Sequence, residues 1–137
     1  MAITTRTLFD GEKKLITSHV DVADGSGATT KIIDVSALNK EHGNTGSACT
    51  KVTLNKIWYD TSSVVTAPVQ VQWDLSSGTQ TPLLSLFNSG HFDFSSIGGI
   101  ANPEESNYTG DIDVVTSSNS SAGESYTLIC EWIKNYD

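Results

Sequence analysis

The most strongly patterned stretch of the sequence is KVTLNKIWYDTSSVVTAPVQVQWD, residues 51–74. In its second half the apolar residues Val69, Val71 and Trp73 alternate with polar ones. A period of two predicts a β-strand with one dry face and one wet face, because successive side chains of a strand point to opposite sides. We therefore expect a half-buried sheet here, with Trp73 on its dry face.

The first half of the stretch breaks this alternation. Val52 and Leu54 share one face, but residues 57–59 (IWY) are consecutive and bulky, so the pattern slips by one residue near Lys56. Either a β-bulge at that point or burial of both faces would explain the slip. We interpret residues 51–74 as two long strands joined by a polar turn, around which the rest of the chain packs.

Bulk composition limits the class of protein. The chain has 137 residues, which suits a single domain over 1–137, and only 18% of them are charged. Ser, Thr, Gly and Asn separate short apolar segments, which favours an all-β domain over a helical one. The formal net charge of −8 opposes binding to nucleic acid and to anionic membranes. No stretch approaches the roughly 20 apolar residues of a membrane span, and no apolar leader follows Met1, so we expect synthesis and folding in a cytoplasm.

Short strands separated by Gly-rich and Asn-rich turns recur along the chain. Pro82 favours an edge position for its strand, and Ile129 and Ile133, on the second face of the last strand, favour a central position for that one. Residues 95–108 follow neither period and predict a long surface loop. Residues 1–9 predict either an N-terminal arm or an edge strand. Further strands are expected at 15–22 and 30–35, as one hairpin, at 79–87 and 91–94, as a second hairpin, and at 111–115 and 125–134.

Eight or nine short strands at near-regular spacing predict an antiparallel β-sandwich of the jelly-roll or Greek-key kind.

No catalytic signature is recognisable. The sequence contains no Gly-x-Ser-x-Gly elbow to position a serine nucleophile, and His19, His42 and His91 are too far apart for a local zinc motif. Cys49 and Cys130 have no metal-ligand spacing, and in a reducing compartment we expect two free, buried thiols. The prediction is a protein that is not an enzyme and needs no cofactor.

Four carboxylates form the only weak candidate for a metal site. Asp111 and Asp113 fall on the same face of one strand, and Glu104 and Glu105 precede them in the loop. Together they could bind a hard cation such as Ca²⁺. A solvated acidic face explains the same residues more simply, so the sequence predicts no metal site.

Several short segments carry a resemblance to a known group of proteins. Most lie in the last third of the chain, at Asp93-Phe94, GGIANP (98–103), GDI (110–112) and GESYTLI (123–129), and two lie earlier, at VTLNKIWY (52–59) and QWD (72–74). This pattern of turns and strands resembles small virion structural proteins of tailed bacteriophages, particularly those of marine phages and cyanophages. The resemblance covers residues 50–134 and includes no catalytic motif.

The resemblance implies a capsid decoration or cement protein, which binds the outer face of the major capsid lattice and stabilises the expanded head. It implies location on the capsid exterior after synthesis in the bacterial host, with the major capsid protein as partner and a homo-oligomer, by analogy a trimer. We expect the contacts in the N-terminal segment and the long loop rather than in the strands. The candidate partner-binding residues are Ile3, Thr5, Leu8, Phe9, Ile97, Ile100 and Pro103.

A different class of function remains open. The chain could be a β-sandwich module of a phage tail, neck or fibre that binds a receptor or a carbohydrate, with Trp58, Trp73 or Trp132 as a stacking platform. Exposure distinguishes the two hypotheses, because a tryptophan that stacks on a sugar must lie at the surface, whereas a core tryptophan is buried.

Overall fold

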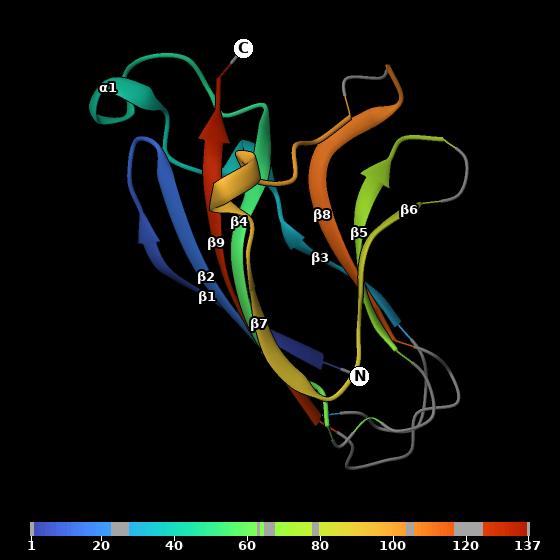
Figure 1. Cartoon of the computed structure of the whole chain (residues 1–137). Coiled ribbons are helices and arrows are strands. Elements are labelled where there is room, and N and C mark those ends of the chain that lie inside the picture. The colour runs from blue at the N-terminus through green and yellow to red at the C-terminus, as the bar shows by residue number, and fades with distance from the viewer. Residues whose placement is uncertain are drawn as a thin grey trace.

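The fold is all-β, as predicted. A computed structural model describes residues 2–22, 28–62, 64, 68–77, 80–103, 106–116 and 125–136. Within these residues, nine strands form two antiparallel sheets that pack face to face as a sandwich (Figure 1).

The first sheet, called sheet A, has five strands in the order β1-β2-β9-β4-β7. The second, called sheet B, has four strands in the order β3-β8-β5-β6. The strands of sheet A are β1 (Ala2–Asp10), β2 (Lys14–Val22), β9 (Ser125–Asn135), β4 (Lys51–Asp60) and β7 (Ser89–Asp93). Those of sheet B are β3 (Ala28–Ile33), β8 (Tyr108–Thr116), β5 (Val69–Leu75) and β6 (Thr81–Leu86). Three short helical turns lie between them, η1 (Val35–Ala37), α1 (Glu41–Asn44) and η2 (Ser95–Ile97).

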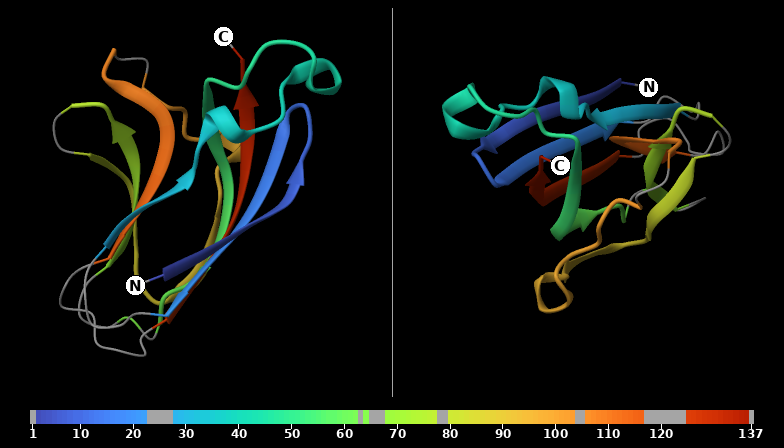
Figure 2. Two further views of the ribbon diagram at one scale, coloured as in Figure 1. Left: turned by 180° about the vertical axis from the view of Figure 1, so that it is seen from behind. Right: turned by 90° about the horizontal axis from the view of Figure 1, so that it is seen from above.

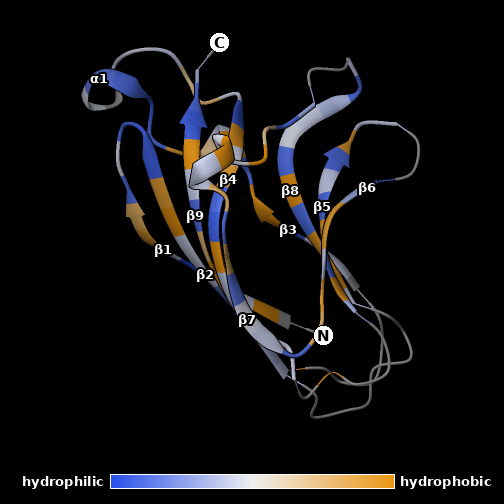
Figure 3. Cartoon of the chain, viewed as in Figure 1, coloured by the Kyte–Doolittle hydropathy of each residue, from blue (hydrophilic) through white to orange (hydrophobic). Residues whose placement is uncertain are grey.

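The core lies between the sheets and follows the alternation of the sequence. Along the strands apolar and polar bands alternate, because successive side chains point into and out of the sandwich (Figure 3). In β5 the residues Val69, Val71 and Trp73 are buried, as their spacing predicted. Trp132 and Leu128 of β9, in sheet A, belong to the same core cluster as these residues of sheet B.

The irregularity near Lys56 is a β-bulge. In the pairing of β4 with β9, Leu54 lies opposite Trp132 and Lys56 opposite Glu131, which leaves Asn55 as the extra residue. The carbonyl of Asn55 accepts a hydrogen bond from Phe94 N at 2.8 Å. After the bulge the alternation is re-phased, so Ile57 is buried and its neighbour Trp58 is exposed.

Both predicted hairpins are wrong. β2 and β3 belong to different sheets, and β7 pairs with β4 rather than with β6. β4 and β5, the two strands of the opening stretch, are likewise in different sheets. Alternation identifies the dry side of a strand but not its sheet, and here consecutive strands repeatedly cross the sandwich. The Gly-rich connection at 24–27 lies outside the described residues.

Edge and centre positions agree with the sequence. Pro82 lies near the start of β6, an edge strand of sheet B, where a missing N–H costs no ladder hydrogen bond. β9 lies in the middle of sheet A. The N-terminal segment forms β1, which pairs with β2 and has no second partner strand among the described residues (Figure 2), so the chain uses the edge-strand alternative rather than the arm.

Candidate partner-binding surfaces

The predicted partner-binding residues of the N-terminal segment lie in different environments. Ile3 packs against the core, and Thr5 Oγ1 lies 3.1 Å from His19 Nδ1. Leu8 and Phe9 lie at a β-bulge in the pairing with β2, and their side chains are about half exposed. Ile3 therefore belongs to the sandwich, whereas Leu8 and Phe9 are available to a partner. Thr5 is exposed as well, but its hydroxyl contacts His19.

His19 anchors β1 to the interior. Its side chain is buried, and its Nε2 lies 2.8 Å from Thr17 Oγ1, which also accepts a hydrogen bond from Trp132 Nε1 at 3.1 Å. Burial lowers the pKa of His19 to about 4, because charging an imidazole away from water is costly. At neutral pH this side chain is therefore a neutral, hydrogen-bonded core histidine.

The predicted residues of the long loop also divide. Ile97, on η2, is 72% exposed. Ile100 is half-buried, because it pairs with Leu54 through two backbone hydrogen bonds, Leu54 N to Ile100 O at 3.0 Å and the reverse at 2.8 Å. This close approach requires Gly99, whose φ is +85° and whose added Cβ would lie 2.6 Å from Thr53 Cγ2. Pro103 is also partly buried, so Ile97 is the fully accessible member of this group.

The N-terminal and loop residues do not form one surface. β1 is one edge strand of sheet A, whereas η2 follows β7, the strand at the other edge. Seen from above, the two segments lie on opposite sides of the molecule (Figure 2, right). A partner that contacted both would have to span the width of the sheet.

The outer face of sheet A is the surface that the sequence did not single out. Its register places Ser18 of β2, Ile129 of β9 and Trp58 of β4 side by side. Trp58 is 44% exposed, whereas Trp73 and Trp132 are buried. The signal was present in the consecutive bulky residues at 57–59 and in the second apolar face of the last strand. The apolar residues of this face are Phe9, Ile16, Val20, Val22, Trp58, Ile129 and Ile133.

The outer face of sheet B is polar and holds the predicted carboxylates. Asp111 accepts hydrogen bonds from Lys31 Nζ at 2.7 Å and from Val35 N at 2.9 Å. Asp74 of β5 accepts one from Thr109 Oγ1 at 2.7 Å and lies 3.9 Å from the same ammonium. A lysine and protein donors thus already satisfy these oxygens, which favours the acidic face over a cation site. Glu104 and Glu105 lie outside the described residues.

Asp113 is the most perturbed carboxyl of that face. It lies opposite Lys31 of β3 and Gln72 of β5 and is buried. Burial first, and then the hydrogen bond and charge of Asp74, raise the pKa of Asp113 to about 7, while Asp74 has its own pKa lowered. The two carboxyl groups therefore share a proton near neutral pH, as closely spaced acids do.

A second cluster of ionisable groups was missed by the sequence, since its members come from separate turns. Glu12 follows β1, whereas Glu41 and His42 belong to α1. One ligand atom from each lies within 4.8 Å of the others, and His42 Nδ1 lies 3.6 Å from Glu12 Oε1. Glu12 and His42 are exposed, and clusters of exposed acidic groups are common without a bound ion.

A lysine and two cysteines are buried in the sandwich. Lys134 Nζ, whose side chain is fully buried, donates to Asp10 Oδ1 at 2.5 Å and to the carbonyls of Gly11 and Asn39 at 2.9 and 2.7 Å. Cys49 and Cys130 are free and buried, as predicted, and burial raises the pKa of both thiols, so neither is poised to react.

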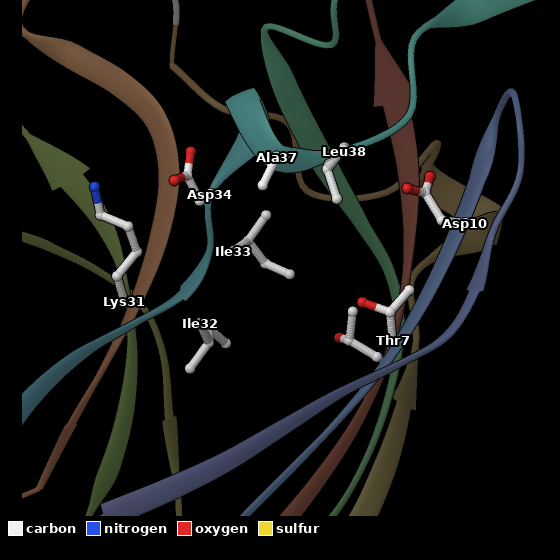
Figure 4. A pocket seen from close by; sticks show the side chains of 9 residues that line it. Thr7, Asp10, Lys31, Ile32, Ile33, Asp34, Ala37 and Leu38 are labelled. Carbon is white, nitrogen blue, oxygen red and sulfur yellow. The ribbon is translucent and has the colours of Figure 1, made fainter. Parts of the chain in front are cut away.

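A cavity of about 380 Å³ opens between the sheets, on the side where the edge strands β1 and β3 face each other. Thr7 and Thr17 line it from sheet A, and Ile32 and Ile33 line it from β3 (Figure 4). Leu38 closes one end. Its volume falls within the roughly 300–1,000 Å³ of small-molecule and cofactor sites.

Among the described helices none is long and apolar enough to cross a membrane. Comparisons with protein-family models, with curated proteins and with solved structures found no match.

Proposed function

We propose that this protein is a non-enzymatic virion structural protein that decorates the outer face of a major capsid lattice. The strand orders of sheets A and B are compatible with a jelly roll, in which consecutive strands cross between the sheets. Support for this function comes from the phage-like segments of the sequence, two of which, residues 52–59 and 98–103, pair at the bulge of β4.

The observation that carries the proposal is the outer face of sheet A. Its aliphatic side chains and Trp58 lie uncovered on a chain of net charge −8. Each fully buried aliphatic or aromatic side chain contributes about 1.5–3 kcal/mol, so covering this face would stabilise an assembly. Ile97, on η2, is a further exposed apolar side chain.

A decoration protein acts through contact area and requires no catalytic group. If the docking surface of the lattice exists only after the head expands, each bound copy stabilises the expanded form by mass action. A homo-oligomer, by analogy a trimer, would multiply the contacts of one copy with neighbouring capsid subunits.

The test mixes purified protein with expanded shells that lack it. We expect saturable binding with lattice stoichiometry and a higher disruption temperature of the decorated shells. Val20→Ser on the outer face of sheet A should weaken binding, whereas the matched Val115→Ser on the outer face of sheet B should leave it unchanged. Absence of saturable binding by the unmodified protein would refute the proposal.

One observation favours the alternative of a receptor-binding or carbohydrate-binding module, the exposure of Trp58. His91 lies opposite it on β7, so a polar group is at hand beside the ring. Glycans that stack on Trp58 should change the fluorescence of the wild type and leave Trp58→Phe with a smaller change. A panel of glycans without any effect on fluorescence would exclude this alternative for Trp58, because Trp73 and Trp132 are buried.

A further inference from the structure

The four edge strands of the sandwich differ in how well they are protected against pairing with another chain. β6 carries Pro82, and β7 is short and contains Gly90. β3 is short, carries Lys31 and has an irregular register between Lys31 and Ile33. Prolines, charges, short lengths and bulges are the devices by which proteins block sheet edges.

β1 has few of these devices. It is the longest of the edge strands, and its residues Ala2 to Thr7 pair regularly with β2. The stretch is rich in threonine, contains neither proline nor glycine, and Arg6 is its one charge before Asp10. Half of the backbone N–H and C=O groups of an antiparallel edge strand point away from its neighbour, so within the described part of the chain β1 has a row of backbone groups that no other strand pairs with.

The cavity beside β1 indicates what kind of segment would fit. A strand added to the free edge of β1 would point every second side chain inward, into the space between β1 and β3. That space has the volume of about 380 Å³ and is lined by the apolar side chains of Ile32, Ile33 and Leu38 (Figure 4). The inward positions of the added strand therefore favour aliphatic residues.

A second copy of β1 does not meet this requirement. Its inward side chains would be those of Ile3, Thr5 and Thr7, and Thr5 is already hydrogen-bonded to His19. Two copies paired through β1 would bring two such cavities together without filling either.

The charges around the cavity limit which kinds of segment could bind there. Asp34, at the β3 wall, has a lowered pKa because Ser36 donates to its carboxylate, so it is ionised at neutral pH. Lys31 is already paired with Asp111, and Asp10 with Lys134. The net charge of the whole chain is −8. The space between β1 and β3 that contains this cavity, called the slot, therefore favours a segment that is neutral or basic.

We propose that the slot between β1 and β3 binds an extended, neutral or basic segment of another protein, which adds to β1 as an antiparallel or parallel strand and fills the cavity with alternate aliphatic side chains. This site is separate from the outer face of sheet A, so it can be tested independently of the capsid hypothesis.

The probe is a displayed library of random 12-residue peptides, selected on the full-length protein. Thr7→Phe fills the slot from β1, and Thr4→Phe, on the outer face of the same strand, is its matched control. Ala37→Phe fills the slot from the opposite wall and replaces Thr7→Phe if that variant melts at a lower temperature than the control.

We expect enriched peptides with aliphatic residues at every second position and few acidic ones. Their affinity should fall at least tenfold on Thr7→Phe and on Ala37→Phe but change less than twofold on Thr4→Phe, and their binding should slow amide hydrogen exchange in β1. The inference is overturned if no peptide is enriched, if the filled variants bind as well as the wild type, or if binding leaves the exchange of β1 unchanged. Peptide binding without shell binding would retain the slot and reject the capsid proposal.

Discussion

The outer faces of the two sheets differ in chemistry although both are built from alternating strands. On sheet A, Ile129 and Trp58 lie side by side and are partly exposed. On sheet B the outer positions of β5 hold Gln72, opposite Asp113 of β8, and Gln70, opposite Val115. Polar side chains satisfy one another across sheet B, whereas the apolar ones on sheet A find no cover within the described part of the chain. Sheet B thus resembles an ordinary solvent face, and sheet A resembles half of an interface.

The largest expected effect is a difference in unfolding free energy between tryptophan variants on the inner and outer faces of sheet A. Trp132→Ala should lower the free energy of unfolding by about 3–5 kcal/mol, because it empties a buried site and removes the donor to Thr17. Trp58→Ala should cost less than about 1 kcal/mol, because its ring is already 44% exposed. Urea unfolding of both variants measures the difference. A cost for Trp58→Ala close to that for Trp132→Ala would mean that the outer face is covered within the protein itself.

The second effect is a loss of folding stability at low pH, caused by the buried His19 on the inner face of sheet A. Burial lowers the pKa of His19 from the ordinary 6.5 of an imidazole to about 4 in the fold, so the unfolded state binds more protons between these values. Stability should therefore fall as the pH is lowered from 6.5 to 4, by roughly 3 kcal/mol at most. Urea unfolding of the wild type and His19→Asn across this range isolates the contribution. Parallel pH profiles of the two proteins would show that His19 does not titrate as inferred.

The third effect has the opposite sign and comes from sheet B. The pKa of Asp113 is raised from 3.8 to about 7, so the folded state binds the extra proton. Its contribution to stability is present below pH 3.8 and is lost as the pH rises to 7. Relative to the wild type, Asp113→Asn should therefore gain about 1–2 kcal/mol of stability between pH 5 and pH 8. The lowered pKa of Asp74 opposes this trend, since its contribution is lost as the pH falls.

If Asp113→Asn showed no such gain between pH 5 and pH 8, the shared proton between Asp74 and Asp113 would be ruled out. Thermal melts at pH 5 and pH 8 provide a direct check, with Asp60→Asn, an exposed aspartate outside the cluster, as the control.

The smallest effect concerns the lysine over this cluster. The side chain of Lys31 is 46% exposed, so its ion pair with Asp111 contributes less than about 1 kcal/mol. Lys31→Gln should change stability little at pH 5. Because the charge of the lysine lowers the pKa of Asp113, its removal should raise that pKa, and the loss of stability associated with Asp113 should then continue to a higher pH. Protein NMR titration of the Asp113 carboxyl measures this shift. An unchanged titration midpoint would separate Lys31 from the cluster.

Much of the fold could be predicted from local pattern. Alternation identified the dry face of β5 and a slip near Lys56, which the structure assigns to a bulge at Asn55, and Pro82 indicated an edge. The candidate site was predicted less well. Leu8, Phe9 and Ile97 are exposed, but Ile3 and Ile100 are engaged by the sandwich. Nothing in the local pattern distinguishes an exposed apolar residue from one that pairs with a distant strand.

The sequence by itself determined the all-β class, because a period of two admits a strand and little else, and it determined the free thiols and the side of each strand that faces the core. Only the tertiary structure decided which strands share a sheet, because sheet membership depends on long connections that cross the sandwich rather than on local alternation. Packing also decided that His19 is neutral, that Asp113 retains a proton near neutral pH, and that β1 and β3 leave a slot between them. These properties arise from burial and from neighbours distant in sequence, and the local pattern contains neither.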